Sequence, residues 1–192
     1  MKINKYILGA GALLCMMLPA ASAQAQDVKL KCMEWNIKSF EYDDNSNAVY
    51  FEIAEAMEKI KAENPDIVCF NEFETATGRM SSVEKLTECA QSLGMFPFFV
   101  FSYDKDNGAY GNGILSKYPI VNSASVLLGM YTGADQRSAG WADILVPTDS
   151  KPEGVKVRIV CTHLDAFGGD ETCLGPVSYT HLRAHETLRH LV

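Results

Sequence analysis

The spacing of apolar residues predicts alternating strands and helices over the first half of the chain. A first strand is predicted at 29–37, and a continuous apolar run at 67–70 indicates a strand buried on both faces. Between them a helix is predicted at 47–62, and Pro65 ends it because proline disfavours helical backbone in the preceding residue. The residues at helical spacing are Tyr50, Ile53, Ala54, Met57 and Ile60.

A second helix and five further strands are predicted after residue 80. Ser81 and Glu84 have the spacing of a capping box at the start of this helix, and Gly94 is its expected end. Residues 111–113, with the sequence GNG, are predicted to form a turn that starts a buried strand. The pattern therefore predicts a single α/β domain. The five strands are predicted at 98–101, 113–116, 121–128, 141–146 and 156–162.

The N-terminus has the pattern of a secretory signal peptide. Two lysines precede the short apolar run 7–18, and two A-x-A sequences follow, ending at Ala23 and Ala25. We expect 1–25 to be the signal peptide, cleaved after Ala25, with Ala23 as the alternative. A leucine rather than a small residue precedes Cys15, which argues against a lipoprotein anchor. The pattern predicts an exported protein, bacterial periplasmic or extracellular, with no stable membrane anchor.

The C-terminal segment resembles a translated cloning adapter. Residues 177–187 read VSYTHLRAHET, and their back-translation resembles the transposase mosaic-end adapter of sequencing libraries. We therefore expect 176–192 to be an artefact and exclude it from the fold. The alternative is a natural helix on which His181 and His185 form a metal site.

Charge and cysteine content narrow the class of protein. The whole chain is 47% hydrophobic and 21% charged, which is a globular composition. Residues 26–175 carry thirteen Lys or Arg against twenty-three Asp or Glu, a net charge of −10 that disfavours non-specific binding to nucleic acid.

The cysteine spacings predict neither a zinc cluster nor a disulfide framework, and a single disulfide is the alternative that the sequence leaves. Cys32, Cys69 and Cys161 lie in apolar runs and are expected to be buried.

Three polar side chains stand where predicted strands end. Asn36 ends the first strand, Glu72 closes the second, and His163 closes the last. Strand ends are a common place for the sites of α/β proteins, so these side chains are candidates to converge on one sheet edge. Taken singly, each also has a structural interpretation: a turn asparagine, a solvated loop carboxylate and a structural histidine.

Four segments, in this order, resemble the endonuclease/exonuclease/phosphatase family. They are the WN that ends the first strand, then NPDIVCFNE at 64–72, GNGILSKYPI at 111–120 and VRIVCTHLD at 157–165. The family includes metal-dependent phosphodiesterases such as pancreatic-type deoxyribonucleases, abasic-site endonucleases and neutral sphingomyelinases. The resemblance implies a four-layer α/β sandwich, with two β-sheets flanked by helices and the C-terminal part missing.

The resemblance also implies roles for the candidate residues. Glu72 matches the family's metal-binding glutamate, and Asn36 matches the asparagine that helps to position metal and phosphate. His163 matches the histidine that contacts the scissile phosphate. The implied cofactor is Mg²⁺ or Mn²⁺, and the implied partner is a phosphoester substrate, either nucleic acid, lipid headgroup or small molecule. Arg137 falls where many relatives carry an arginine near the substrate, but by itself it would be expected on the exposed surface.

The sequence departs from the family in its last part. The family's GD-x-N and terminal S-D-H segments have no match, and Thr172 stands where the first of them requires asparagine. We therefore expect 26–175 to be a truncated domain of an exported, monomeric, metal-dependent phosphodiesterase or phosphatase, inactive as this 192-residue chain. The acidic charge favours a lipid or small phosphodiester over DNA. The alternative is a non-catalytic secreted binding protein of the same fold.

Overall fold

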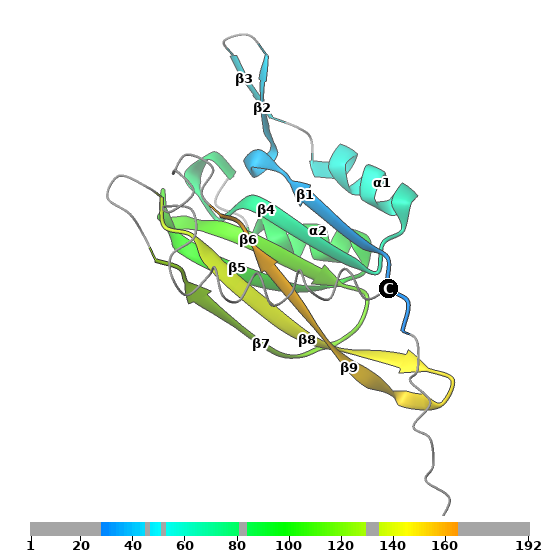
Figure 1. The fold of residues 1–192 in the computed structure, drawn as a ribbon. Coiled ribbons are helices and arrows are strands. Elements are labelled where there is room, and N and C mark those ends of the chain that lie inside the picture. The colour runs from blue at the N-terminus through cyan, green and yellow to red at the C-terminus, as the bar shows by residue number, and fades with distance from the viewer. Residues whose placement is uncertain (1–27, 45–46, 51–52, 81–83, 130–134, 165–192) are drawn as a thin grey trace, which may run out of the picture.

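The computed structural model of the protein describes residues 28–44, 47–50, 53–80, 84–129 and 135–164. The predicted signal peptide, the adapter-like segment, His181 and His185 lie outside these residues, as do Asp165 and Thr172. Two α-helices, two short 3₁₀ helices and nine strands are described within them (Figure 1). Their bounds are β1 Cys32–Asn36, β2 Glu41–Asp44, β3 Asn47–Tyr50, α1 Ile53–Glu63, β4 Ile67–Thr75, α2 Lys85–Leu93, β5 Phe96–Lys105, β6 Gly108–Ser116, β7 Ile120–Leu127, β8 Ser138–Thr148 and β9 Lys151–Thr162.

Two sheets form the centre of the fold. The first has the strand order β1-β4-β6-β5, in which β1 and β4 are parallel and the other pairs are antiparallel. The second has the order β7-β8-β9 and is antiparallel throughout. Figure 1 shows α1 and α2 on one side of the first sheet and the second sheet on the other. The α/β sandwich is thereby confirmed, and three of its layers lie within the described residues.

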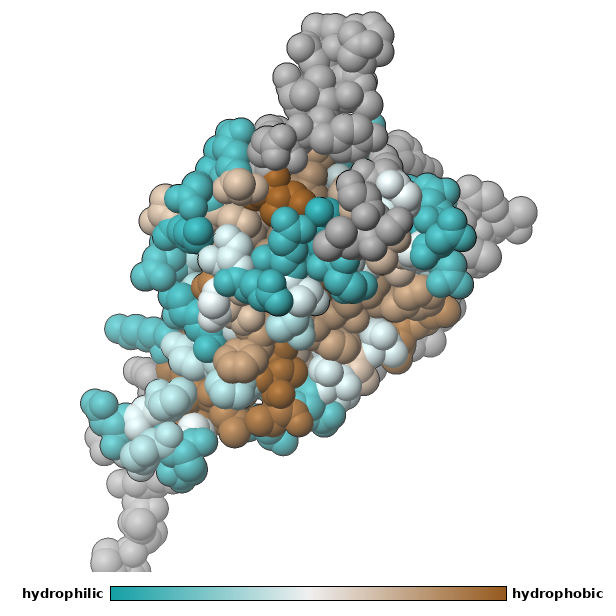
Figure 2. Space-filling view, turned by 180° about the vertical axis from the view of Figure 1, so that it is seen from behind, coloured by the Kyte–Doolittle hydropathy of each residue, from teal (hydrophilic) through white to brown (hydrophobic). Residues whose placement is uncertain are grey.

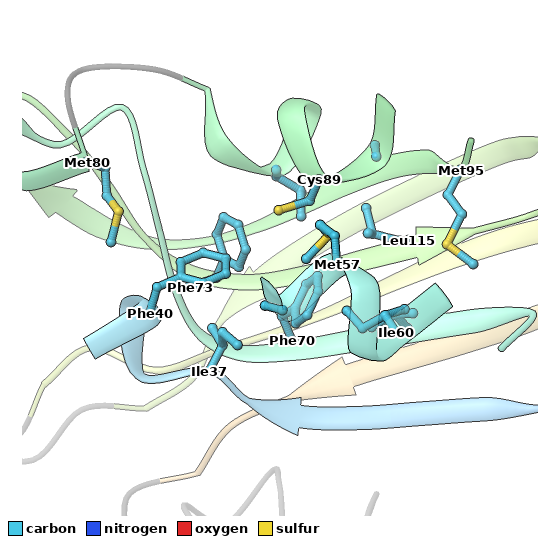
Figure 3. Close-up of a cluster of buried hydrophobic side chains, with 14 residues drawn as sticks. Ile37, Phe40, Met57, Ile60, Phe70, Phe73, Met80, Cys89, Met95 and Leu115 are labelled. Atoms are coloured by element: carbon cyan, nitrogen blue, oxygen red, sulfur yellow. The ribbon is translucent and has the colours of Figure 1, made fainter. Parts of the chain in front are cut away.

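The core between the helices and the first sheet is rich in aromatic and methionine side chains. Phe70 and Phe73 of β4 are fully buried, with ring centroids 5.4 Å apart, and Phe73 meets Phe40 edge-on at 5.5 Å. Met57 of α1 and Cys89 of α2 pack onto the same cluster (Figure 3). Burial of this apolar surface attaches both helices to the sheet.

A second core lies between the two sheets. Ile67 and Ile114 from the first sheet pack against Ala142 and Ile144 of β8, and all four are fully buried. The hydroxyls of Ser102 and Ser138, 2.6 Å apart and buried, add a polar link between β5 and β8. The two faces of the first sheet are therefore both covered, which explains the continuous apolar run of β4.

The predicted helix at 47–62 is wrong at its start. Residues 47–50 form β3, which pairs with β2 so that Tyr50 lies opposite Glu41. Figure 1 shows this hairpin projecting from the body of the molecule. The helix proper is α1, on which Ala56, Met57 and Ile60 are buried as the pattern predicted.

The predicted capping box is also wrong, because a tertiary contact takes its place. Glu84 is the residue before α2 and makes no side-chain cap hydrogen bond, while Ser81 lies outside the described residues. The first helical N–H, that of Lys85, donates to Thr75 Oγ1 at the end of β4 (3.0 Å). The helix ends at Gly94 in left-handed backbone (φ 65°), as expected.

The predicted turn at 111–113 is wrong as well. Asp106 and Asn107, both at positive φ, make the turn, and β6 then runs without a break through Gly111 and Gly113. A Cβ atom at Gly111 would lie 2.1 Å from the Val100 carbonyl oxygen. These glycines therefore allow close strand and helix packing and do not form a loop.

Cysteine burial follows the position of each strand in the sheets. The described cysteines are free thiols: Cys161 and Cys89 are buried, Cys69 is half-buried, and Cys32 is exposed. The expected burial of Cys32 is wrong because β1 is an edge strand whose residues 32, 34 and 36 stay exposed. Burial raises the pKa of the Cys89 thiol to about 12.

The surface opposite the view of Figure 1 is mixed in character. Figure 2 shows hydrophilic side chains over much of this face, with hydrophobic patches between them. Within the described residues, no helix has both the length and the apolar character needed to cross a membrane.

Candidate active site

The first two predicted site residues meet at the ends of parallel strands. Asn36 is the last residue of β1, paired in register with Asn71 of β4, and Glu72 is the next residue along β4. The Asn36 Nδ2 donates to Glu72 Oε1 at 2.8 Å. The Asn36 Oδ1 accepts the backbone N–H of Lys38 at 3.1 Å, so the amide is held from both sides.

Glu72 does not close its strand, contrary to the sequence prediction. It lies in a β-bulge between Phe70 and Phe73, and β4 continues to Thr75. Its φ of 54° is in the left-handed region, which is uncommon for a residue with a Cβ atom. A bulge re-aims a side chain locally, and here it turns the carboxylate towards Asn36.

The segment after Asn36 is also in left-handed backbone. Lys38, Ser39 and Phe40 have φ values of 46°, 53° and 60°. Buried Phe40 anchors this turn in the helix-side core, and Ser39 Oγ donates to the Glu72 carbonyl at 3.2 Å. Unfavourable backbone on both sides of the Asn36–Glu72 contact is typical of a site whose geometry is fixed by its surroundings.

His163 reaches the same place from the other sheet. It follows β9, and Thr162 Oγ1 donates to the Ser138 carbonyl at 3.0 Å, which fixes the end of β9 against β8. His163 Nε2 lies 3.7 Å from Glu72 Oε1, close enough for an ion pair when the imidazole is protonated. The structure therefore brings Asn36, Glu72 and His163 together.

Arg137 is part of this cluster, although its sequence position alone suggested an exposed surface residue. It is half-buried just before β8, and its Nη1 lies 3.5 Å from His163 Nδ1. Burial raises the pKa of the Tyr110 hydroxyl on β6, and the positive charge of Arg137 opposes that shift. Sequence reasoning missed Tyr110 entirely, because only the pairing of β4 and β6 places it near Glu72.

An open cleft of about 360 Å³ lies beside Glu72. Lys38 and Lys105 contribute positive charge to its walls, and Glu41 and Asp135 contribute negative charge. Tyr103 and Tyr110 form an aromatic part of the lining. The cleft can therefore accept a ligand that has both an anionic group and an apolar part.

The donor set fits a divalent cation held by few protein ligands. The Glu72 side chain is about a quarter exposed, so its carboxylate is accessible. Among the described residues no group of three or more His, Cys, Asp and Glu could enclose a metal. One carboxylate with a neighbouring amide is suited to Mg²⁺, which keeps several waters and completes its shell with phosphate oxygens.

Comparison of the sequence with models of known protein families identifies the family of this chain. The family model "Endonuclease/Exonuclease/phosphatase family" matches residues 33–184, and the chain belongs to this family. The range matched by the family model extends beyond Gly175, and the domain boundary expected at Gly175 stays a prediction. A search of the curated proteins finds no match.

Solved structures of this family share the fold. An endonuclease/exonuclease/phosphatase protein from Leptotrichia buccalis has a TM-score of 0.58 at 10% identity, over 82% of this chain and 63% of that one. The human Nocturnin catalytic domain has a TM-score of 0.54 at 20% identity, over 85% of this chain and 61% of that one. An endonuclease/exonuclease/phosphatase protein from Beutenbergia cavernae has a TM-score of 0.54 at 23% identity, over 73% of this chain and 39% of that one. The chain thus spans about two fifths to just under two thirds of these proteins.

Proposed function

We propose that the protein hydrolyses a phosphate ester with the help of Mg²⁺ or Mn²⁺. The observation that carries this proposal is the Glu72 carboxylate, which lines the cleft, accepts a hydrogen bond from Asn36 and lies 3.7 Å from His163. The family membership supports the same chemistry. The human Nocturnin domain was solved with a bound sulfate anion, a tetrahedral oxyanion comparable to phosphate, which supports an anion site in this fold.

Each residue has a distinct role in the proposed reaction. Glu72 holds the cation, and Asn36 orients the carboxylate and is a second candidate ligand. The metal, when bound, polarises the phosphoryl group and activates water. His163 lies beside Glu72 and Arg137 lies beside His163, and in the proposed reaction both stabilise negative charge on the phosphoryl oxygens.

The substrate class and location form part of the proposal. The net charge of −10 over 26–175 and the mixed charge of the cleft favour a lipid headgroup or small phosphodiester over DNA. We propose that the protein is exported, on the basis of the signal-like N-terminus, and that it is a monomer. Comparison of sphingomyelin, a small phosphodiester and plasmid DNA as substrates of the protein encoded by the genomic reading frame decides between these classes, and hydrolysis of none of them favours the non-catalytic binding protein.

The metal site can be tested on the 192-residue chain without activity. We expect Glu72→Gln to weaken Mn²⁺ binding, measured by electron paramagnetic resonance titration, by about tenfold or more, because the hard anionic ligand is lost. Glu58→Gln is the matched control on the exposed surface of α1 and should leave binding unchanged. Equal Mn²⁺ affinity of the Glu72 variant and the wild type would contradict the proposed role of Glu72.

A further inference from the structure

We propose that Lys105, held on the wall of the cleft by the buried carboxylate of Glu74, binds a second anionic group of the substrate, in addition to the phosphoryl group at Glu72. This inference rests on the proposed function and narrows its substrate class to small phosphodiesters that carry a second anionic group. It assigns a role to an ion pair that lies outside the motifs of the sequence.

Glu74 is a carboxylate that has no contact with solvent. Its side chain is fully buried, and its Oε1 lies 2.6 Å from the Lys105 ammonium. Its Oε2 accepts a hydrogen bond from Thr77 Oγ1 at 3.1 Å, and Thr77 is also fully buried. A buried carboxylate is unfavourable unless it is paired and hydrogen-bonded, so these contacts hold the ammonium of Lys105 in place.

The backbone around this ion pair is closely packed. Lys105 is the last residue of β5 and is paired in register with Gly108 of β6. A Cβ atom at Gly108 would collide with the backbone of Thr75 at the end of β4, so a glycine is needed for this approach. The N–H of Gly78 donates to the carbonyl of Asp106 at 3.1 Å. The position of Lys105 is therefore set by the backbone as well as by its ion pair.

Lys105 nevertheless reaches the solvent of the cleft. Its side chain is 31% exposed, and it lines the cleft together with Lys38 and Glu72. An ammonium group has three N–H donors, so the bond to Glu74 leaves donors for a ligand. Because the side chain is already held in place, little further conformational entropy is lost when an anion binds to it.

The charge balance at the cleft makes this binding depend on metal. Two ammonium groups stand against four carboxylates, which are those of Lys38, Lys105, Glu41, Glu72, Glu74 and Asp135. A divalent cation at Glu72 offsets this excess of negative charge. Both anionic groups of a ligand are therefore expected to bind only when the metal is present.

The aromatic lining favours an anionic over a cationic second group. The rings of Tyr103 and Tyr110 are stacked, with centroids 4.9 Å apart and an interplanar angle of 25°. The Lys105 ammonium lies 5.2 Å from the centroid of the Tyr110 ring. The Tyr110 ring thus already has a cation beside it, and a choline-like group would have to compete with Lys105 for this ring.

The test compares two ligands that differ in one anionic group. Both 3-phosphoglycerate and glycerol 3-phosphate carry a phosphomonoester, and only the first also carries a carboxylate. Their affinities for the 192-residue chain in the presence of Mg²⁺ are measured by isothermal titration calorimetry. We expect 3-phosphoglycerate to bind about tenfold more tightly, because a hydrogen bond between two charged groups is stronger than one to a neutral hydroxyl.

Replacement of both members of the ion pair separates ligand binding from a structural role. Glu74→Gln combined with Lys105→Gln leaves no unpaired buried charge and keeps an acceptor for Thr77, so the fold should persist. This double variant should lose the tenfold preference and keep its affinity for glycerol 3-phosphate. Glu58→Gln combined with Lys61→Gln makes the same chemical change at an exposed ion pair of α1 and should keep the preference.

The outcomes distinguish this inference from the proposed function. Equal binding of the two ligands by the wild-type chain overturns the inference and leaves the phosphoryl site at Glu72 intact. A preference that survives in the Glu74 and Lys105 double variant also overturns it, as does an equal loss of affinity for both ligands in that variant. Tighter binding of phosphocholine than of 3-phosphoglycerate would likewise contradict an anionic second group. Binding of neither phosphate ligand overturns the proposed function at its anion site, and this inference with it.

Discussion

Glu72 combines a candidate catalytic side chain with an unfavourable backbone conformation. Its φ of 54° costs a residue with a Cβ atom roughly 1–2 kcal/mol relative to ordinary backbone. The register shift between Phe70 and Phe73 imposes this conformation, and it directs the carboxylate to Asn36. Stability is therefore lost at this residue in favour of site geometry, a pattern common at functional positions.

Paired substitutions test this strain. We expect Glu72→Gly to be more stable than Glu72→Ala by about 1 kcal/mol, because glycine adopts left-handed backbone without a Cβ clash. Both variants lose the bond to Asn36, so this loss cancels in the comparison. At Glu58 within α1 the order should reverse, with alanine the more stable by about 1 kcal/mol. Urea denaturation measures both differences. If the alanine variant were the more stable one at position 72 as well as at position 58, the backbone of Glu72 would not be strained.

At the scale of elements, the glycines of β6 allow α2 and β5 to pack closely against this strand. A Cβ atom at Gly113 would lie 2.7 Å from Leu86 Cδ1 of α2, and one at Gly111 would lie 2.1 Å from the Val100 carbonyl oxygen of β5. The pairing of β6 with β4 and β5 in turn sets the positions of Glu72 and Tyr110. The glycines of the GNG segment thus support the site from within the sheet.

Substitution of these glycines should show how closely the strands pack. We expect Gly111→Ala to lower the free energy of unfolding by roughly 1–3 kcal/mol, because the clash is with rigid backbone of β5. Gly129→Ala is the matched control, since nothing lies within 4 Å of the Cβ position there, and should change stability by less than about 0.5 kcal/mol. The midpoint of urea unfolding gives both values. If Gly111→Ala left the free energy of unfolding unchanged, β5 and β6 could move apart at this position without loss of stability.

At the scale of the whole molecule, the site depends on both sheets at once. Asn36, Glu72 and Tyr110 come from the first sheet, while Arg137 and His163 adjoin strands of the second. The buried Ser102–Ser138 contact and the core between the sheets hold these two groups in register. The chain spans at most 63% of the length of the solved relatives described above.

The source DNA tests the extent of the domain. We expect the genomic reading frame to continue past the codon for Gly175 for roughly 100 residues, within the size of an ordinary domain, and to encode the GD-x-N and S-D-H segments. Sequencing across that codon is the measurement. A genomic frame that encodes 177–192 and then stops would contradict the adapter interpretation, and His181 and His185 would then need a test for metal binding.

The sequence alone determined the family, the alternation of the main strands and helices, and the three candidate residues. These follow from short-range patterns, such as the apolar run of β4, the helical spacing in α1 and the WN, FNE and THL motifs. The β2–β3 hairpin was missed because its pairing competes with a helical pattern that extends through Tyr50. The cap of α2 was missed because Thr75 supplies it from another element. The bulge at Glu72, the contact of Arg137 with His163 and the position of Tyr110 in the cleft beside Glu72 depend on the tertiary structure, because strand register and sheet packing bring together residues that are distant in sequence.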